Sequence, residues 1–364
     1  MLENLNQEGK ANSENYQAVN MTFNGITYQS AHDIAMDVFN SNILHFKQEA
    51  KQIAEDRAKK ITKKFITKIL NKNPELVNNF RTPSLQDDLF NVQKAYAKLE
   101  DEQLSDLLVE LLVERTQENE RNYKQIIYIE ALDVVQKLTA AQIDAITINF
   151  IVIYLEINFV RKGVTSNFTS IVIETLKPFT NHIHTNKHYY EHSGIFSYLE
   201  YCGCGYIREG SYDLFEDRLL KTYSYHYQKN IPIRDFEEIA GPATEYDFIE
   251  VKNDGANEVR FRCNQATLNI LLKGTTMLPN NVTKTYNAAQ RNSIMYLFDS
   301  FKLSSGEVKQ QFINESPDFV NLINFWNNTK IRSTQLTDVA KAIAISNLNT
   351  KLNLDIDFSR YIRP

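Results

Sequence analysis

A long amphipathic pattern near the N-terminus constrains this chain more than any other feature. Apolar residues recur at helical spacing from Ile34 to Leu70. Such a run of about 40 residues would extend roughly 60 Å as one unbroken helix. Ser30, with Asp33 three residues later, gives a start similar to a capping box, and Asn40-Ser41-Asn42 is the most favourable place for a break. A pattern of this length without internal caps predicts a helix that packs against a long partner.

The leader that precedes this pattern alternates like a β-strand. It is divided by Asn24-Gly25, the favoured dipeptide of a two-residue hairpin turn. A lone hairpin is marginally stable in water, so this one needs another surface to pair with or pack on. The leader therefore predicts assembly of the chain into a homo-oligomer. The expected contacts are Tyr16, Met21, Phe23, Ile26 and Tyr28.

The composition indicates a globular, helix-rich chain. Of the 364 residues, 43% are hydrophobic and 23% are charged, so a sizeable core can form. The chain has only 11 glycines and 8 prolines, which favours long helices because these two residues interrupt them. The three cysteines show no disulfide spacing, which fits a reducing cytoplasm. The most apolar run, Ala145 to Leu155, is far shorter than the ~20 residues that span a bilayer. We therefore expect a cytoplasmic protein with no membrane span, and this run predicts a buried core helix.

The fold class predicted is mainly α: a multi-helix bundle with an N-terminal β-hairpin leader, a long basic helix and a small β-hairpin in the C-terminal region. Residues 84–99 and 101–115 predict a helical hairpin. After Pro242, residues 246–252 and 257–263 alternate around the turn signal Asn253-Asp254-Gly255. The predicted domains are the leader 1–29, a helical domain 30–241 and an α+β region 242–364.

The tail predicts a short strand, an N-cap and a helix in succession. Thr334 to Leu336 has strand character, Thr337 is suited to capping, and residues 338–352 have a helical pattern. Leu354 to Tyr361 predicts a closing strand.

Three degenerate and mainly structural motifs occur at residues 15–18 with 25–28, residues 88–112 with 138–142, and residues 336–344. They resemble segments of a set of uncharacterised bacterial proteins that are similar to the abortive-infection alpha family. The sequence departs from the usual pattern at Val19-Asn20-Met21, which replaces Gly-x-Asp, and at Ala340, which replaces Gly. The resemblance implies a bacterial, cytoplasmic, helical protein with a role in phage defence, and it carries over no catalytic residue.

Charge is segregated along the chain, although the net charge is only −5. Residues 47–72 hold nine Lys or Arg against three acidic residues, and residues 87–120 hold ten acidic against three basic residues. Pairing of the two blocks, or simple solvation of the basic face, is the main interpretation. The alternative is a nucleic-acid-binding protein in which this face contacts phosphates. The lysines concerned are Lys59, Lys60, Lys63, Lys64 and Lys68.

A histidine cluster is the strongest candidate for chemistry. His184, His188 and His192 follow i, i+4, i+8 spacing, which places them on one helix face where they can bind a metal ion. The spacing matches no standard zinc signature, so solvated or core histidines are the main interpretation and a metal-dependent hydrolase is the second alternative. Cys202-Gly203-Cys204-Gly205 lacks the C-x-x-C spacing of redox dithiols and favours a structural helix-end turn.

Taken together, the sequence favours a non-enzymatic oligomeric interaction protein. The phosphate-cradling motifs G-x-x-x-x-G-K-[ST] and G-x-G-x-x-G are missing, so no cofactor is predicted. No general base stands out, so an enzyme is the less favoured class. The expected partners are copies of the chain and a protein encoded nearby or by a phage.

Overall fold

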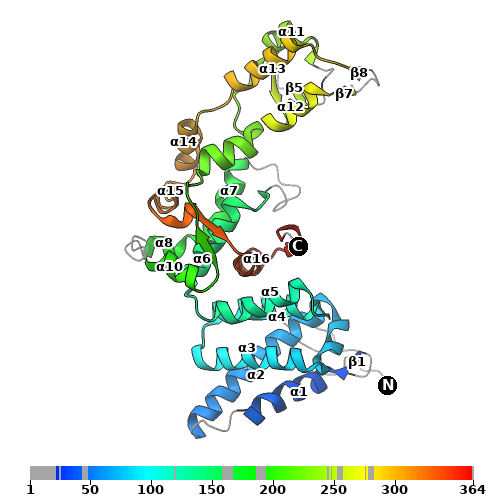
Figure 1. The fold of residues 1–364 in the computed structure, drawn as a ribbon, viewed down its shortest axis with the longest axis vertical. Coiled ribbons are helices and arrows are strands. Elements are labelled where there is room, and N and C mark those ends of the chain that lie inside the picture. The colour runs from blue at the N-terminus through cyan, green and yellow to red at the C-terminus, as the bar shows by residue number, and fades with distance from the viewer. Residues whose placement is uncertain are drawn as a thin grey trace, which may run out of the picture. The chain divides into compact units, whose positions relative to one another are not determined.

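A computed structural model shows a mainly helical protein with a few short antiparallel strand pairs, as predicted from the sequence (Figure 1). No helix among the described residues is both long enough and apolar enough to cross a membrane. The structure describes residues 22–23, 26–42, 48–118, 120–157, 167–185, 194–243, 246, 248–251, 257–274, 276–277 and 283–362.

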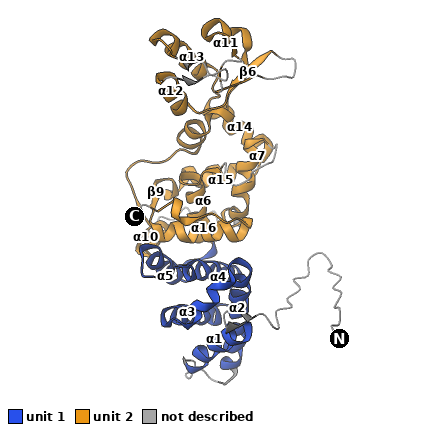
Figure 2. Ribbon diagram, turned by 90° about the vertical axis from the view of Figure 1, so that its right-hand side faces the viewer, with its two compact units in different colours: residues 1–140, 363–364 blue, residues 141–362 orange. Residues whose placement is uncertain are grey.

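The chain divides into two compact units, one of residues 1–140 and one of residues 141–362 (Figure 2). Gly241, where the sequence predicts a boundary, lies inside the second unit at the C-terminal end of helix α11 (Ile233–Ala240). The leader predicted for residues 1–29 falls largely outside the described residues.

The first unit is built from packed helices. Helix α4 is its centre, because it contacts α2, α3 and α5 and buries residues around most of its circumference. Two short strands, β1 (Thr22–Phe23) and β2 (Ile26–Thr27), precede the helices. The helices are α1 (Tyr28–Asn42), α2 (Gln48–Lys72), the 3₁₀ helix η1 (Pro74–Arg81), α3 (Pro83–Leu99), α4 (Glu102–Thr116) and α5 (Tyr123–Val135).

The amphipathic pattern at the N-terminus forms two helices instead of one. Helix α1 ends at Asn42, within the segment where the sequence predicts a break, and α2 begins at Gln48. The apolar stripe of α2 is buried at spacings of three and four residues, as the pattern requires for a helix with one face in the core. Its buried members are Ala54, Ala58, Ile61, Phe65 and Ile69.

The turn between α3 and α4 explains why these helices form the predicted hairpin. Glu100 adopts a left-handed conformation with φ of 48° at the end of α3. The Asp101 side chain then accepts a hydrogen bond of 3.0 Å from the Leu104 amide and caps α4. The hairpin returns α4 antiparallel to α3 and brings it against α2.

Most of the helices among the described residues belong to the second unit, and several of them are short. Its helices are α6 (Ala140–Ile153), α7 (Phe168–Leu176), η3 (Lys177–Phe179), α8 (Asn181–Thr185), α10 (Gly194–Tyr201), the π-helix η4 (Leu214–Leu220), η5 (Ser224–His226), α11, α12 (Gln265–Lys273), α13 (Ala288–Ser300), α14 (Ser305–Glu315), α15 (Phe319–Asn328), η7 (Lys330–Ser333), α16 (Asp338–Leu352) and η8 (Phe358–Arg360).

Its strands form small antiparallel sheets. The hairpin predicted after Pro242 is confirmed, since β5 pairs with β6 and Val251 lies opposite Val259. Strand β4 pairs with the other edge of β6, and β3 pairs with the distant β9. The bounds are β3 (Gly205–Ile207), β4 (Ile231–Pro232), β5 (Ile249–Val251), β6 (Glu258–Phe261), β7 (Thr276–Met277), β8 (Thr283–Lys284) and β9 (Thr334–Leu336).

Two helices are buried nearly all round and form the centre of the second unit. Residues 141–152 of α6 and residues 342–349 of α16 are buried without a break. This confirms the buried helix predicted from the run Ala145 to Leu155, because a helix that is apolar on every side must lie in a core. A separate cluster of buried side chains between Ile231 and Phe298 surrounds the β4–β6–β5 sheet.

The predicted tail is correct in part. Strand β9, the N-cap Thr337 and helix α16 follow one another as expected, and the Thr337 hydroxyl accepts from the Ala340 amide at 3.3 Å. The closing strand predicted for Leu354 to Tyr361 is wrong. The Asp357 side chain accepts from the Ser359 amide at 2.9 Å and directs residues 358–360 into the 3₁₀ turn η8.

Candidate functional site

The basic and acidic blocks of the first unit meet as a series of ion pairs between α2 and α4, which we call the α2–α4 ladder. Lys60 and Lys64 both contact Glu102, and the Lys64 ammonium also lies 2.7 Å from the Asp106 carboxylate. Further along the two helices, Lys68 pairs with Glu110 and Lys72 pairs with Glu114. The structure thus confirms the pairing of the charge blocks within one chain.

Glu102 is the most strongly perturbed group in the ladder. Hydrogen bonds from Lys60, Lys64 and the Tyr96 hydroxyl lower the pKa of the Glu102 carboxyl to about 2. The same hydrogen bond, which the Lys60 ammonium donates to the Glu102 carboxylate, raises the pKa of Lys60. Both side chains are about half exposed, at 53% for Lys60 and 50% for Glu102, so solvent screens the interaction.

This pairing bears directly on the nucleic-acid alternative. Lys60, Lys64 and Lys68 neutralise carboxylates of α4, and Lys59 lies 3.7 Å from Asp56 on its own helix. Lys63 is exposed. Phosphate contacts by the three paired lysines would have to compete with carboxylates that are already in place. Nucleic-acid binding through this face remains a prediction.

The leader residues proposed as oligomer contacts are only partly within the described chain. Tyr16 and Met21 lie outside the described residues, while Phe23 and Ile26 lie opposite each other in the β1–β2 pair. Tyr28 begins α1, and its ring stacks on His32 with centroids 6.3 Å apart. Partial burial raises the pKa of the Tyr28 hydroxyl.

The predicted metal ligands fall largely outside the described residues. His188 and His192 are not among the described residues, and the side chain of His184 is not described. In the described part of the chain, no group of three or more His, Cys, Asp or Glu side chains is placed to hold a metal ion. A metal site at this cluster remains a prediction.

The histidine nearest to them in sequence, His182, belongs to a different arrangement, which we call the Asp144 cluster. The Asp144 carboxylate is 2% exposed and accepts from the Lys351 ammonium at 2.6 Å and from the Asn347 amide at 3.1 Å. Its second oxygen lies 2.7 Å from Nδ1 of His182. Asn347 also donates to the Thr147 hydroxyl at 2.9 Å. The cluster therefore joins α6, α8 and α16.

The chemistry of the Asp144 cluster is that of a satisfied buried anion. A buried carboxylate is tolerated where cationic and polar donors compensate for lost hydration, and here protein groups contact both carboxylate oxygens. A carboxylate on Nδ1 also orients an imidazole ring, as in general-base pairs. Lys351 and Asn347 occupy the other oxygen, so the geometry assigns Asp144 a stabilising role.

Sequence reasoning missed this cluster because Asp144 stands next to the apolar run Ala145 to Leu155. A charged residue beside such a run normally marks the point where a helix leaves the core. Helix α6 begins at Ala140, before the apolar run, so Asp144 lies inside the helix and among its buried residues. A helix start placed ahead of the apolar run would have been the signal for a buried Asp144. Its partners Asn347 and Lys351 lie about 200 residues away, and no local pattern connects them.

The Cys202-Gly203-Cys204-Gly205 segment forms the structural helix-end turn that the sequence favours. Gly203 has φ of +73°, and the amides of Gly203 and Cys204 donate to the carbonyls of Glu200 and Leu199. A Cβ on Gly205 would lie 2.7 Å from the Gln335 carbonyl, so the approach of β3 to β9 requires glycine there. Burial raises the pKa of Cys204 to about 12, which keeps this thiol protonated and unreactive.

Three exposed tyrosines surround this turn and form what we call the tyrosine surface. Tyr201 is 84% exposed, Tyr206 is 55% exposed and Tyr198 is 38% exposed. The rings of Tyr198 and Tyr201 are 6.1 Å apart. Tyrosine is enriched at protein interfaces because it presents a rigid apolar ring with a polar tip.

Comparison with known proteins places the chain in a family without giving it an activity. A protein-family model matches residues 25–362, and the chain belongs to this uncharacterised family. Neither a curated protein nor a solved structure matches the chain. The match extends over described residues of both units, and it provides no connection to the abortive-infection alpha family.

Proposed function

We propose that the protein is a non-enzymatic interaction protein that associates with a second copy of itself through its N-terminal segment. The supporting observation is the β1–β2 pair, in which Thr22 lies opposite Thr27 and Phe23 lies opposite Ile26. Within the described residues, no third strand pairs with either of them. A two-stranded ribbon is marginal by itself, and its open edges can accept a further strand. Strand addition from a second copy would satisfy both requirements.

The residues proposed for the contact are those predicted from the leader. Tyr16, Met21, Phe23 and Ile26 would supply the apolar contact area, and Tyr28 would contribute beside its stacking contact with His32. A role for this assembly in bacterial phage defence is proposed from the sequence resemblance alone.

In this proposal the charge blocks do not form contacts between subunits, although their segregation along the sequence would allow such contacts. Opposed blocks can set the register between two subunits. Here Lys60, Lys64, Lys68 and Lys72 meet carboxylates of α4 in the same chain. The self-association proposed here therefore depends on strand edges and apolar side chains, and we expect it to be only weakly sensitive to salt.

Light scattering coupled to size-exclusion chromatography tests this proposal. The samples are the full chain, a chain that starts at Tyr28 and so keeps α1 intact, and the point variant Ile26→Lys. We expect the full chain to be a dimer or larger and both altered chains to be monomers. The matched control is the double variant Tyr201→Ser with Tyr206→Ser, which changes exposed apolar side chains in the second unit and should leave the assembly unchanged.

Two results would contradict the proposal. One is a monomeric full chain, and the other is a chain starting at Tyr28 that keeps the full oligomeric mass. Dissociation by the tyrosine double variant alone would move the interface to the tyrosine surface and would remove the leader from it.

A further inference from the structure

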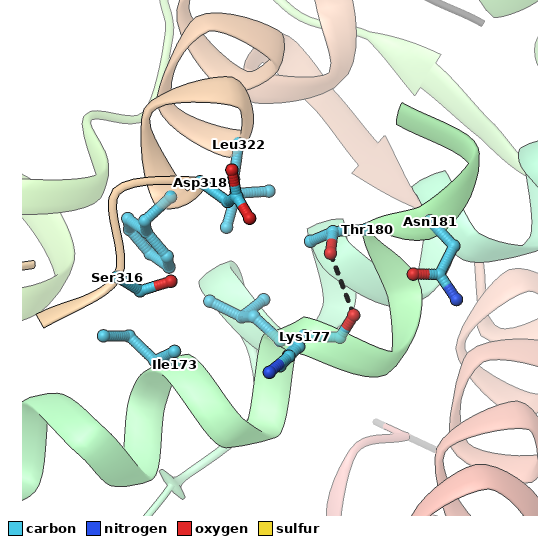
Figure 3. A pocket seen from close by; sticks show the side chains of 9 residues that line it. Ile173, Lys177, Thr180, Asn181, Ser316, Asp318 and Leu322 are labelled. Atoms are coloured by element: carbon cyan, nitrogen blue, oxygen red, sulfur yellow. Dashed lines mark hydrogen bonds between the residues drawn. The ribbon is translucent and has the colours of Figure 1, made fainter. Parts of the chain in front are cut away.

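A pocket in the second unit, unconnected with the proposed self-association, opens between α7–η3–α8 and the start of α15 (Figure 3). Its volume is about 210 Å³. Drug-sized ligands occupy pockets of roughly 300–1,000 Å³, so this one suits a smaller molecule. The lining residues are Ile173, Leu176, Lys177, Thr180, Asn181, Ser316, Asp318, Phe319 and Leu322.

The lining separates into an apolar part and a charged part. Ile173, Leu176, Phe319 and Leu322 are buried, with exposed fractions of 8% or less, and give the pocket an apolar wall. Lys177 and Asp318 are exposed and have opposite charges. Figure 3 shows that the acidic residue comes from the segment between α14 and α15, whereas the lysine belongs to η3.

Both charged groups are available to a ligand. In the described part of the chain, neither Lys177 nor Asp318 takes part in an ion pair. Asp318 stands at the N-cap position of α15, but its side chain makes no capping hydrogen bond. An anion at this end of α15 would find few free amides, because those of Phe319 and Asn321 already donate to Ser316 and Asp318 at 2.9 and 3.0 Å. A ligand carboxylate would therefore bind at the lysine, and a ligand ammonium at the aspartate.

The segment that carries Lys177 is held firmly enough to present it. The Thr180 hydroxyl donates to the Lys177 carbonyl at 2.9 Å, a bond drawn in Figure 3. The ammonium of Lys351 lies 3.4 Å from the Pro178 carbonyl and 5.0 Å from the centre of the Phe179 ring. The next helix, α8, carries His182 of the Asp144 cluster. Such preorganisation lowers the entropic cost of binding.

We propose that this pocket binds a small zwitterion with an aliphatic group, that is, a free amino acid with a side chain such as that of leucine. The carboxylate of the ligand contacts the Lys177 ammonium, its ammonium contacts the Asp318 carboxylate, and its branched side chain packs on the wall of Leu176, Phe319 and Leu322. Polar groups that fix the orientation of a ligand beside an apolar wall are usual features of a metabolite site.

Isothermal titration calorimetry on the full chain tests the proposal with L-leucine and two matched probes. Isoamylamine lacks the carboxylate of leucine, and 4-methylpentanoate lacks its ammonium. We expect one L-leucine per chain, detectable at or below about 10 mM, and binding of each probe at least about tenfold weaker, because each loses one charge-assisted contact.

Variants at the two charged groups give a second, independent readout. Lys177→Met and Asp318→Asn should each weaken L-leucine binding at least about tenfold, whereas Lys177→Arg keeps the charge and should retain binding. Asn is a good N-cap residue, so Asp318→Asn should leave α15 intact. Lys273→Met, at an exposed lysine of α12 outside the pocket, is the matched control and should bind like the unaltered chain.

The proposal is overturned if about 100 mM L-leucine, tenfold above the expected range, gives no heat of binding and no rise in the melting temperature of the protein. It is also overturned if 4-methylpentanoate binds as tightly as L-leucine, because the pocket would then select an anion. Equal binding by Lys177→Met and the unaltered chain would place the ligand elsewhere. None of these results affects the light-scattering test of self-association.

Discussion

The α2–α4 ladder and the Asp144 cluster use the same two chemical groups, a lysine ammonium and a carboxylate, in opposite surroundings. In the ladder the side chains of Lys60 and Glu102 are 53% and 50% exposed. In the cluster Asp144 is 2% exposed and Lys351 is 22% exposed. The ladder joins helices about 40 residues apart in the sequence, and the cluster joins segments about 200 residues apart.

This difference in exposure determines how much each arrangement contributes to the stability of the fold. Exposed pairs contribute only about 0.2–1 kcal/mol each, because water competes for both groups and salt screens them. Removing either partner of a buried ion pair costs about 3–5 kcal/mol when nothing else compensates the groups left behind. The number of ion pairs is therefore a poor guide to their importance here. Four of the five ladder contacts join side chains that are at least 21% exposed and orient neighbouring helices, whereas a single buried aspartate fixes α16 against α6.

The largest effect in this comparison is expected for Asp144→Ala. The change leaves Lys351 and Asn347 without their common acceptor in a largely buried place, so we expect the free energy of unfolding to fall by about 3 kcal/mol. Trp326 is the only tryptophan of the chain, is 1% exposed and lies in the second unit, so its fluorescence in urea reports on this unit. Asp106→Ala, in the ladder, is the control and should not shift the Trp326 transition. An unchanged transition for Asp144→Ala would show that burial does not separate the two arrangements.

Lys351→Met tests the same cluster from the cationic side and should have a smaller effect. Asn347 and His182 continue to contact Asp144, and the methionine stem can keep packing on the Phe179 ring that the ammonium now overlies at 5.0 Å. We expect a loss of about 2 kcal/mol, in the range of a hydrogen bond to a charged group. The Trp326 transition in urea measures it, with Lys273→Met as the exposed-lysine control. A loss larger than that of Asp144→Ala would contradict this order.

Much of the fold could be predicted because its signals are local. The stripe of α2, the hairpin of α3 and α4, and the Thr337 cap are each encoded within a few turns of chain, where spacing and capping chemistry act directly. The strand predicted for Leu354 to Tyr361 is wrong because a different local signal decides the structure there. The side chain of Asp357 alone is enough to form a turn. The pairing of β3 with β9 involves residues about 130 apart and left no local mark.

The candidate sites were less predictable because they depend on contacts between distant segments. Segregated charge correctly predicted the ladder, since both blocks are visible in the sequence. Asp144 stands at the border of an apolar run, and no signal in the sequence connects Lys177 with Asp318, about 140 residues further along the chain. Only the packing of α15 near η3 brings the last two to one pocket.

Lys68→Met tests whether burial of the carboxylate, and not its place in the ladder, decides the cost of losing an ion pair. Its partner Glu110 has a side chain that is only 6% exposed, although Lys68 itself is 38% exposed. If burial of the carboxylate decides the cost, this variant should lose about 1 kcal/mol, more than any variant at an exposed rung. Hydrogen exchange of α2 and α4 peptides, followed by mass spectrometry, measures the loss in the first unit. Lys60→Met is the matched control, and an equal loss in the two variants would contradict the argument from burial.

The smallest effect is expected for Glu102→Gln, at the exposed end of the ladder. Lys60 and Lys64 remain solvated after the change, so the loss should be about 0.5 kcal/mol and should decrease further in 1 M salt. The pKa of Glu102 is lowered to about 2 from an ordinary value of 4.5, so its contribution is complete above pH 4.5 and is lost as the pH falls toward 2. The difference in α2 and α4 exchange between the variant and the unaltered chain should follow the same course. A difference that persists unchanged at pH 2.5 or in high salt would mean that packing of the Glu102 stem, and not its charge, stabilises this end of the ladder.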